Sequence, residues 1–169
     1  MTTFRLRLPQ HQARLISLAV GYHLSRPGSE IDRETMGEYE HGLREVQPLI
    51  DGQLEAPVAE VDLNPVQAVL LSTAFSSVLS ELKMYSVFDT MAGDSRRPRS
   101  TAPGFDQRLR DLFPAITGDP AYASQLAEDM ALLRRELPSA RARQVLEAQR
   151  QALEEERRRK KWWQLWKRR

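Results

Sequence analysis

The segment from Asn64 to Met91 constrains the fold most strongly, because it is the most apolar stretch of the chain. Asn64 and Pro65 form a strong helix start, with Asn64 as N-cap and Pro65 in the first helical position. Small residues such as Ser72 and Ser76 permit close approach of neighbouring elements. We therefore expect a central core helix over residues 65–91. The apolar window from Val66 to Leu79 is too short and too polar for a membrane span.

Two short segments alternate apolar and charged residues with the period of a half-buried strand. They are Phe4–Leu8 and Ala59–Leu63, and each precedes a proline and a helical pattern. The first carries Arg5 and Arg7 on its polar face, and the second carries Glu60 and Asp62. Opposite charges on facing strands are stabilising, so we expect a two-stranded sheet. The alternative is that both strands are edges of separate hairpins.

The two strand–helix segments also match each other at a separation of 55 residues. Leu8 matches Leu63, Gln12 matches Gln67, Ala13 matches Ala68, Leu15 matches Leu70 and Ser17 matches Ser72. This spacing favours an internal repeat of residues 4–54 and 59–91. The alternative is that the match reflects no duplication, because any two segments made of a strand, a proline and an amphipathic helix have similar sequences.

Helical spacing and breakers define the other elements. We expect helices over 10–25, 30–54 with a kink or break near Pro48, 105–113, 120–137 and 139–161, and a loop over 92–104. The predicted fold is mainly α, with about five or six helices, a small two-stranded sheet and a long C-terminal helix. Its parts are a core domain over 1–137, a projecting helix over 138–156 and a basic aromatic tail over 157–169.

Charge is distributed unevenly along the chain. The tail holds eight of the 25 Lys and Arg and no acid, whereas the other residues hold 17 basic and all 23 acidic side chains. The tail therefore carries +8 and the body −6, so attraction to polyanions is focused at one end.

The tail, RRRKKWWQLWKRR, also contains all three tryptophans. On a helix, its four large apolar side chains lie within an arc of about 160°, and cations lie on the other side. This pattern is typical of interfacial membrane attachment. Docking of the aromatic residues into a protein groove and nucleic-acid binding are the alternatives. The candidate binding residues are Arg157, Arg158, Arg159, Lys160, Lys161, Trp162, Trp163, Leu165, Trp166, Lys167, Arg168 and Arg169.

Catalytic motifs are not evident in the sequence. With no cysteine, thiolate catalysis and Cys-ligated metals are excluded. Glu38 and His41 have the spacing of a di-iron motif, but no second copy exists, so we expect no metal, cofactor or enzymatic activity. His11 is expected at the surface, and His23 near the end of a helix. Arg96, Arg97 and Arg99 in the predicted loop could contact phosphate.

These patterns predict a non-enzymatic cytoplasmic adaptor or scaffold, held at the inner surface of an anionic membrane by its tail. The N-terminal residues lack the apolar run of a secretory signal. Its body would bind an unknown protein partner or a second copy in a homodimer. The alternatives are a nucleic-acid-binding accessory protein that uses the tail and Arg96–Arg99, and a complex subunit docked by its aromatic tail.

Overall fold

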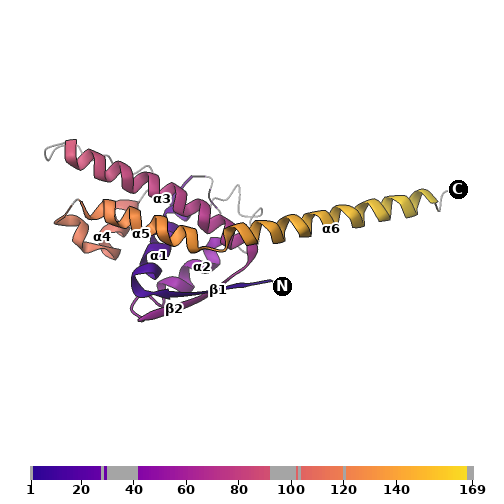
Figure 1. Ribbon diagram of the computed structural model, residues 1–169, viewed down its shortest axis with the longest axis horizontal. Helices are drawn as coiled ribbons and strands as arrows, with labels where there is room; N and C mark the ends of the chain where they lie inside the picture. Colours follow the sequence, from indigo (N-terminus) through magenta and orange to yellow (C-terminus); the bar gives the residue numbers. More distant parts are fainter. Residues whose placement is uncertain are drawn as a thin grey trace.

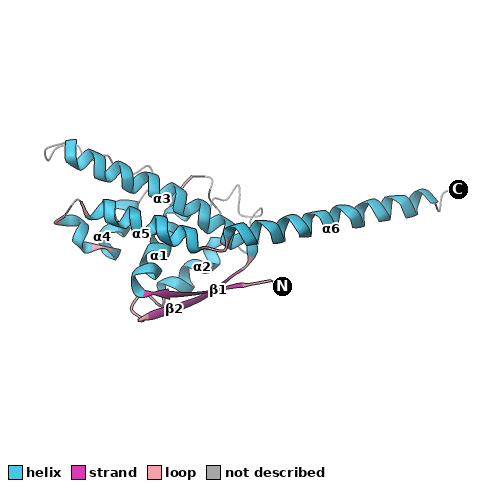
Figure 2. Cartoon of the chain, in the orientation of Figure 1, coloured by secondary structure: helices cyan, strands magenta, loops and turns pink. Residues whose placement is uncertain are grey.

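The computed structural model describes residues 2–27, 29, 42–91, 102, 104–119 and 121–166, without the side chains of 86–91 and 161–166. In these ranges the protein is mainly helical, with six α-helices and one small antiparallel sheet (Figure 2). The elements are β1 Phe4–Pro9, α1 Gln10–Ser25, α2 Leu43–Asp51, β2 Val58–Leu63, α3 Pro65–Met91, α4 Phe105–Leu112, the 3-10 turn η1 Pro114–Thr117, α5 Tyr122–Glu136 and α6 Ser139–Trp166. The predicted fold class is confirmed.

Helix α3 is the centre of the body, as its apolar sequence predicts. It packs against α1, α5 and the first turns of α6, and its buried residues include Leu71, Phe75 and Leu82. The predicted cap is present: the Gln67 N–H donates to Asn64 Oδ1 (2.9 Å), and the Asn64 N–H donates to Gln67 Oε1 (2.9 Å). This reciprocal pair satisfies two backbone donors at the helix start.

Two features of α3 differ from the sequence pattern. The apolar side chain of Met84 is exposed, whereas Glu81 is buried and accepts a 2.8 Å hydrogen bond from the Tyr22 hydroxyl. The segment Pro65–Tyr85 reaches the length and mean hydropathy (1.2) of a membrane span, and 61% of its window is buried in the body. A core helix of a folded body passes the same test.

The small sheet lies along one edge of the body, below α1 and α2 in Figure 1. β1 and β2 pair antiparallel, with Arg5 opposite Asp62 and Arg7 opposite Glu60. Both charge pairs form salt bridges, at 3.0 Å and 2.9 Å. Phe4, Leu8, Ala59, Val61 and Leu63 face the core. The predicted pairing is therefore confirmed, and the hairpin alternative is wrong.

The pairing register of β1 and β2 can be compared with the predicted internal repeat. The 55-residue spacing equates Leu6 with Val61, and these two residues also lie opposite each other in the sheet. An antiparallel strand pair has a local two-fold axis. Here that axis passes between Leu6 and Val61, the two residues that the 55-residue repeat equates. Ala13, Ile16 and Ser17 of α1 are buried, as are their matches Ala68, Leu71 and Ser72 of α3. The duplication stays a prediction, which this symmetry supports.

The second predicted helix is shorter than its sequence pattern. Residues 30–41 lie outside the described part, and α2 covers only Leu43–Asp51. The helix continues through Pro48 instead of breaking near Gln47. Its last α-helical bond runs from the Gly52 N–H to the Pro48 carbonyl. The Gln53 N–H then bonds the Ile50 carbonyl in a tighter turn, so the helix ends before Leu54. Val46 and Ile50 on one side of the helix are buried, while Leu49 is exposed.

The remaining helices follow their predicted ranges closely. α4 ends before Pro114, and α5 begins two residues after Pro120. Leu126, Met130 and Leu133 form the buried stripe of α5. α6 then leaves the body and extends far beyond it (Figure 1).

Candidate functional site

Helix α6 has two parts with different surroundings. Near its start Ala142 is buried and Val145 is partly buried against the core. All fourteen residues from Glu147 to Lys160 are exposed, including the large apolar side chain of Leu153. We call residues 147–160 the stalk. Ala, Glu, Gln, Leu and Arg are strong helix formers, which explains why this segment is helical without tertiary contacts.

Ion pairs along the stalk add local support. Arg150 pairs with Glu154 (3.3 Å), and Glu156 pairs with Lys160 (2.7 Å), each at a separation of four residues. The Lys160 hydrogen bond lowers the pKa of the Glu156 carboxyl. Pairs at this spacing stabilise isolated helices modestly, and a helix that is polar on all sides depends on them.

The predicted binding residues lie at the end of this stalk. Arg157, Arg158, Arg159 and Lys160 are all exposed. The helical backbone continues through Trp166, so Lys161, Trp162, Trp163, Leu165 and Trp166 are helical. The side chains of these five residues lie outside the described part, as do Lys167, Arg168 and Arg169. The helical conformation that the amphipathic argument requires is therefore present up to Trp166.

The other candidates from the sequence fall into two groups. Arg96, Arg97, Arg99, Glu38 and His41 lie outside the described residues. His11 is exposed, as expected, and its Nε2 lies 2.9 Å from Asp129 Oδ2. His23 lies in the last turn of α1.

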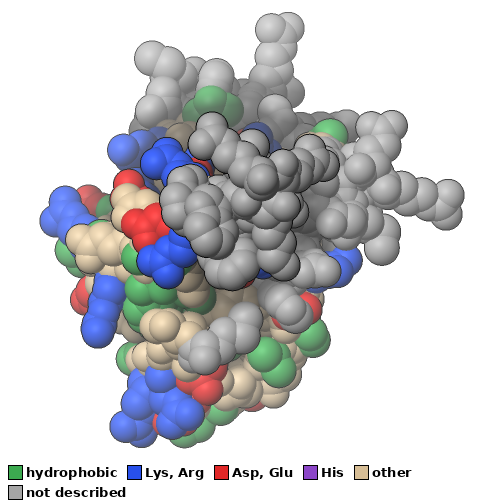
Figure 3. Space-filling view, turned by 90° about the vertical axis from the view of Figure 1, so that its right-hand side faces the viewer, with side chains coloured by type: hydrophobic (Ala, Val, Ile, Leu, Met, Phe, Trp, Pro, Cys, Tyr) green, Lys and Arg blue, Asp and Glu red, His purple; other side chains and the backbone are tan. Residues whose placement is uncertain are grey.

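The described surface can also be viewed from the C-terminal end of α6. Figure 3 views the molecule from this end, and the described Lys and Arg side chains alternate there with Asp and Glu. On this face the described cations do not form one continuous patch. The concentration of positive charge in the tail comes from the sequence, which has eight Lys or Arg and no acid over residues 157–169.

A polar cluster that the sequence did not reveal joins α1, α2 and α4. Arg108 Nη2 donates to both carboxylate oxygens of Asp51 (2.8 and 2.9 Å) and to Ser17 Oγ (2.8 Å). Arg108 Nε donates to the Ser17 carbonyl (3.2 Å), and the Ser17 hydroxyl donates to Asp51 Oδ1 (2.7 Å). We call Ser17, Asp51 and Arg108 the α1–α2–α4 cluster.

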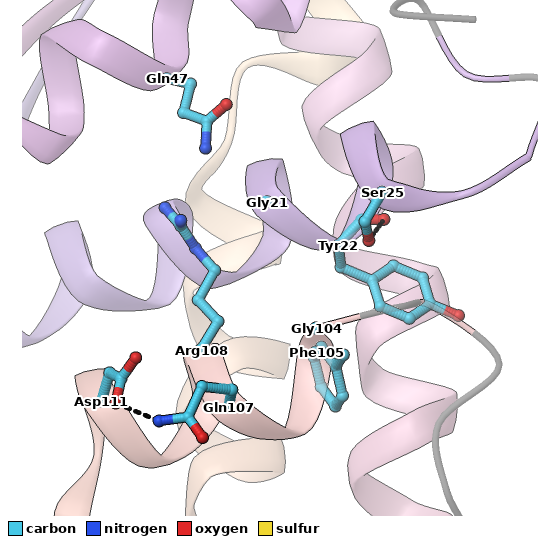
Figure 4. A pocket seen from close by; sticks show the side chains of 9 residues that line it. All are labelled: Gly21, Tyr22, Ser25, Gln47, Gly104, Phe105, Gln107, Arg108 and Asp111. Carbon is cyan, nitrogen blue, oxygen red and sulfur yellow. Dashed lines mark hydrogen bonds between the residues drawn. The ribbon is translucent and has the colours of Figure 1, made fainter.

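Gly21 makes this cluster sterically possible. Arg108 rises from α4 and passes beside Gly21 of α1 (Figure 4). A Cβ atom at position 21 would lie 2.6 Å from Arg108 Cδ, closer than unbonded carbons can approach. A glycine within a helix often marks such a close approach, and this was the available sequence signal.

An open pocket of about 360 Å³ lies beside the cluster. Its polar lining includes Ser25, Gln47, Gln107, Arg108 and Asp111. Gln107 donates to Asp111 Oδ1 (2.8 Å), and the Ser25 hydroxyl donates to the Tyr22 carbonyl (3.0 Å). Ser25, Gln107, Arg108 and Asp111 are thus bonded to neighbouring groups. Among the described residues, no three His, Asp or Glu side chains are grouped to hold a metal ion.

Comparison with known proteins gives no relative: no protein-family model, curated protein or solved structure matches the chain.

Proposed function

We propose that this chain is a non-enzymatic adaptor, which its stalk and tail attach to an anionic membrane surface. The observation that carries the proposal is the course of α6, which is exposed from Glu147 and stays helical into the tail. An exposed helix without a covering partner has no role in the core. It places a segment with eight cations and three tryptophans away from the body.

The stalk keeps the charges of the body and the tail apart. The ten residues from Glu147 to Glu156, before the tail begins at Arg157, span about 15 Å at the rise of an α-helix. This is nearly two Debye lengths, because the Debye length is about 8 Å at physiological ionic strength. Charges of the body below the stalk therefore weaken the positive field of the tail only slightly, whereas Glu154, Glu155 and Glu156 adjoin it directly. A compact arrangement would cancel part of that field.

The helical tail combines the two forces that hold peripheral proteins at membranes. Cations near an anionic leaflet contribute up to about 1 kcal/mol each, and Trp rings insert at the level of the headgroups. The backbone is helical to Trp166, and at 100° per residue positions 162, 163 and 166 of an α-helix fall within an arc of about 100°. Membrane attachment then requires no refolding of this segment.

The body supports an adaptor role more than a catalytic one. The charged groups of the α1–α2–α4 cluster bond one another and connect three helices. Such a network rigidifies a fold. We assign the body to protein binding and the cluster to the stability of the body.

Vesicle flotation tests the proposal. The full chain should float with phosphatidylcholine vesicles that contain phosphatidylglycerol and not with phosphatidylcholine alone. Deletion of residues 162–169, or the triple substitution Trp162→Ala, Trp163→Ala and Trp166→Ala, should abolish flotation. The matched control is Gln144→Ala, Gln149→Ala and Gln151→Ala, which changes three exposed residues of α6 and should float normally.

Three other outcomes would contradict membrane attachment. Equal flotation of the deleted and full chains would remove the tail from the mechanism. Salt-sensitive retention on RNA or DNA without vesicle binding would favour nucleic acid. Tail-dependent association with a purified protein, again without vesicle binding, would favour an aromatic anchor in a protein groove.

A further inference from the structure

The two outer edges of the small sheet differ. On β2, the side chain of Gln53 covers the edge: its Oε1 accepts from the Glu60 N–H (2.9 Å) and its Nε2 donates to the Glu60 carbonyl (3.0 Å). Both backbone groups of Glu60 therefore point away from β1. In an antiparallel ladder, the residue opposite also points its backbone groups outward. That residue is Arg7.

Within the described part of the chain, no segment pairs with the outer edge of β1. By the alternation of the ladder, the N–H and C=O groups of Arg5 and Arg7 face away from β2. No other described residue forms a hydrogen bond with these groups. The Arg5 and Arg7 side chains are 68% and 73% exposed. An open edge of this kind is a template for one additional strand.

The side chains of β1 determine which residue pattern an added strand needs in order to pair with its outer edge. A residue placed opposite Arg5 or Arg7 lies on the polar face. Both guanidinium groups already bind an acid of β2, but each has five N–H donors and can bind a second carboxylate on its other side. The residue between them lies on the apolar face beside Leu6, which is only partly buried. The matching pattern is acid–apolar–acid, and β2 supplies an internal example: Glu60, Val61 and Asp62 pair with β1 in this way on the other edge.

We propose that the outer edge of β1 binds an extended acidic peptide with alternating acid and apolar residues, by β-strand addition. A second copy fits poorly, because antiparallel pairing of two β1 strands about Leu6 would place Arg5 opposite Arg7 of the other copy. Like charges directly opposite are destabilising. The site is separate from the tail, so it stands or fails independently of membrane attachment.

The test keeps the full chain unchanged and varies the peptide. The probe is the synthetic peptide PVAEVDLN, which copies residues 57–64, with blocked ends and a fluorescent label. Binding is measured by anisotropy, and amide hydrogen exchange of Arg5 and Arg7 by NMR. We expect saturable binding and slower exchange of these two amides. A peptide with Lys in place of both acids should bind at least about tenfold more weakly.

Backbone methylation is the decisive comparison. Methylation of the Glu and Asp nitrogens removes the donors that face β1, so affinity should fall at least about tenfold. Methylation of the intervening Val nitrogen, which faces away, should have little effect. Equal affinity of the two methylated peptides, or no binding, would overturn the proposal. Protection of Arg5 and Arg7 that rises with protein concentration alone would assign the edge to a second copy instead.

Discussion

At the scale of single residues, the contact between Gly21 and Arg108 has the clearest energetic consequence. Arg108 bonds Asp51 and Ser17 only because position 21 has no side chain. Hydrogen bonds to charged groups contribute about 1.5–3 kcal/mol. A glycine within a helix costs about 1 kcal/mol relative to alanine. The helix therefore carries a glycine because the bonds of Arg108 outweigh this cost.

The substitution Gly21→Ala should lower the free energy of unfolding by about 1–2 kcal/mol, because displacement of Arg108 outweighs the gain in helix propensity. Urea unfolding followed by circular dichroism measures the change. Gly118→Ala is the matched control: a Cβ there meets nothing within 4 Å. Its effect should stay within about 0.5 kcal/mol.

In an Arg108→Ala background, the effect of Gly21→Ala on the free energy of unfolding should have the opposite sign. Once the guanidinium is absent, Gly21→Ala should raise the free energy of unfolding by up to about 1 kcal/mol through helix propensity. A loss of stability in both backgrounds would show that some contact other than Arg108 limits position 21.

Asp62 gives a prediction for pH. The hydrogen bond from Arg5 lowers the pKa of the Asp62 carboxyl below its ordinary value of 3.8. A carboxyl with a lower pKa in the folded state adds stability above its unfolded pKa, and this is lost as pH falls through the folded pKa. The stability difference between the wild type and Asp62→Asn should therefore be constant from neutral pH to about 5. It should shrink as the pH falls through the ordinary value of 3.8 and then through the lowered folded pKa. A difference that persists in stronger acid would contradict this origin.

At the scale of elements, the charge pattern of the strands determines their pairing. Arg5→Glu with Arg7→Glu should lower the thermal unfolding midpoint, because four carboxylates would then face one another across the sheet. Adding Glu60→Arg and Asp62→Arg should restore most of the loss. Failure of this rescue would mean that the salt bridges contribute nothing and that the apolar face alone holds the strands.

The elements show what the sequence could predict. Asn64-Pro65 located the start of α3, and alternation located both strands, because these signals act over a few neighbouring residues. The antiparallel direction of the strands was not predictable, since either direction can place Arg opposite an acid. The end of α2 at Asp51 and the burial of Glu81 depend on contacts with distant residues. Arg108 was missed for the same reason, although Gly21 was a local signal.

At the scale of the whole molecule, the chain has a compact acidic body and one long helix that extends from it (Figure 1). The sequence predicted the charge asymmetry and the projecting helix. Which surface the tail meets depends on a partner outside the chain. The central claim is therefore that the aromatic side of the tail enters an anionic membrane.

Intrinsic tryptophan fluorescence tests this claim most directly, because all three tryptophans are in the tail. Titration with vesicles containing phosphatidylglycerol should shift the emission to shorter wavelength, and lipids brominated on their acyl chains should quench it. Phosphatidylcholine vesicles should have little effect. Unchanged emission, or a shift without quenching by the brominated lipids, would contradict membrane insertion of the tail.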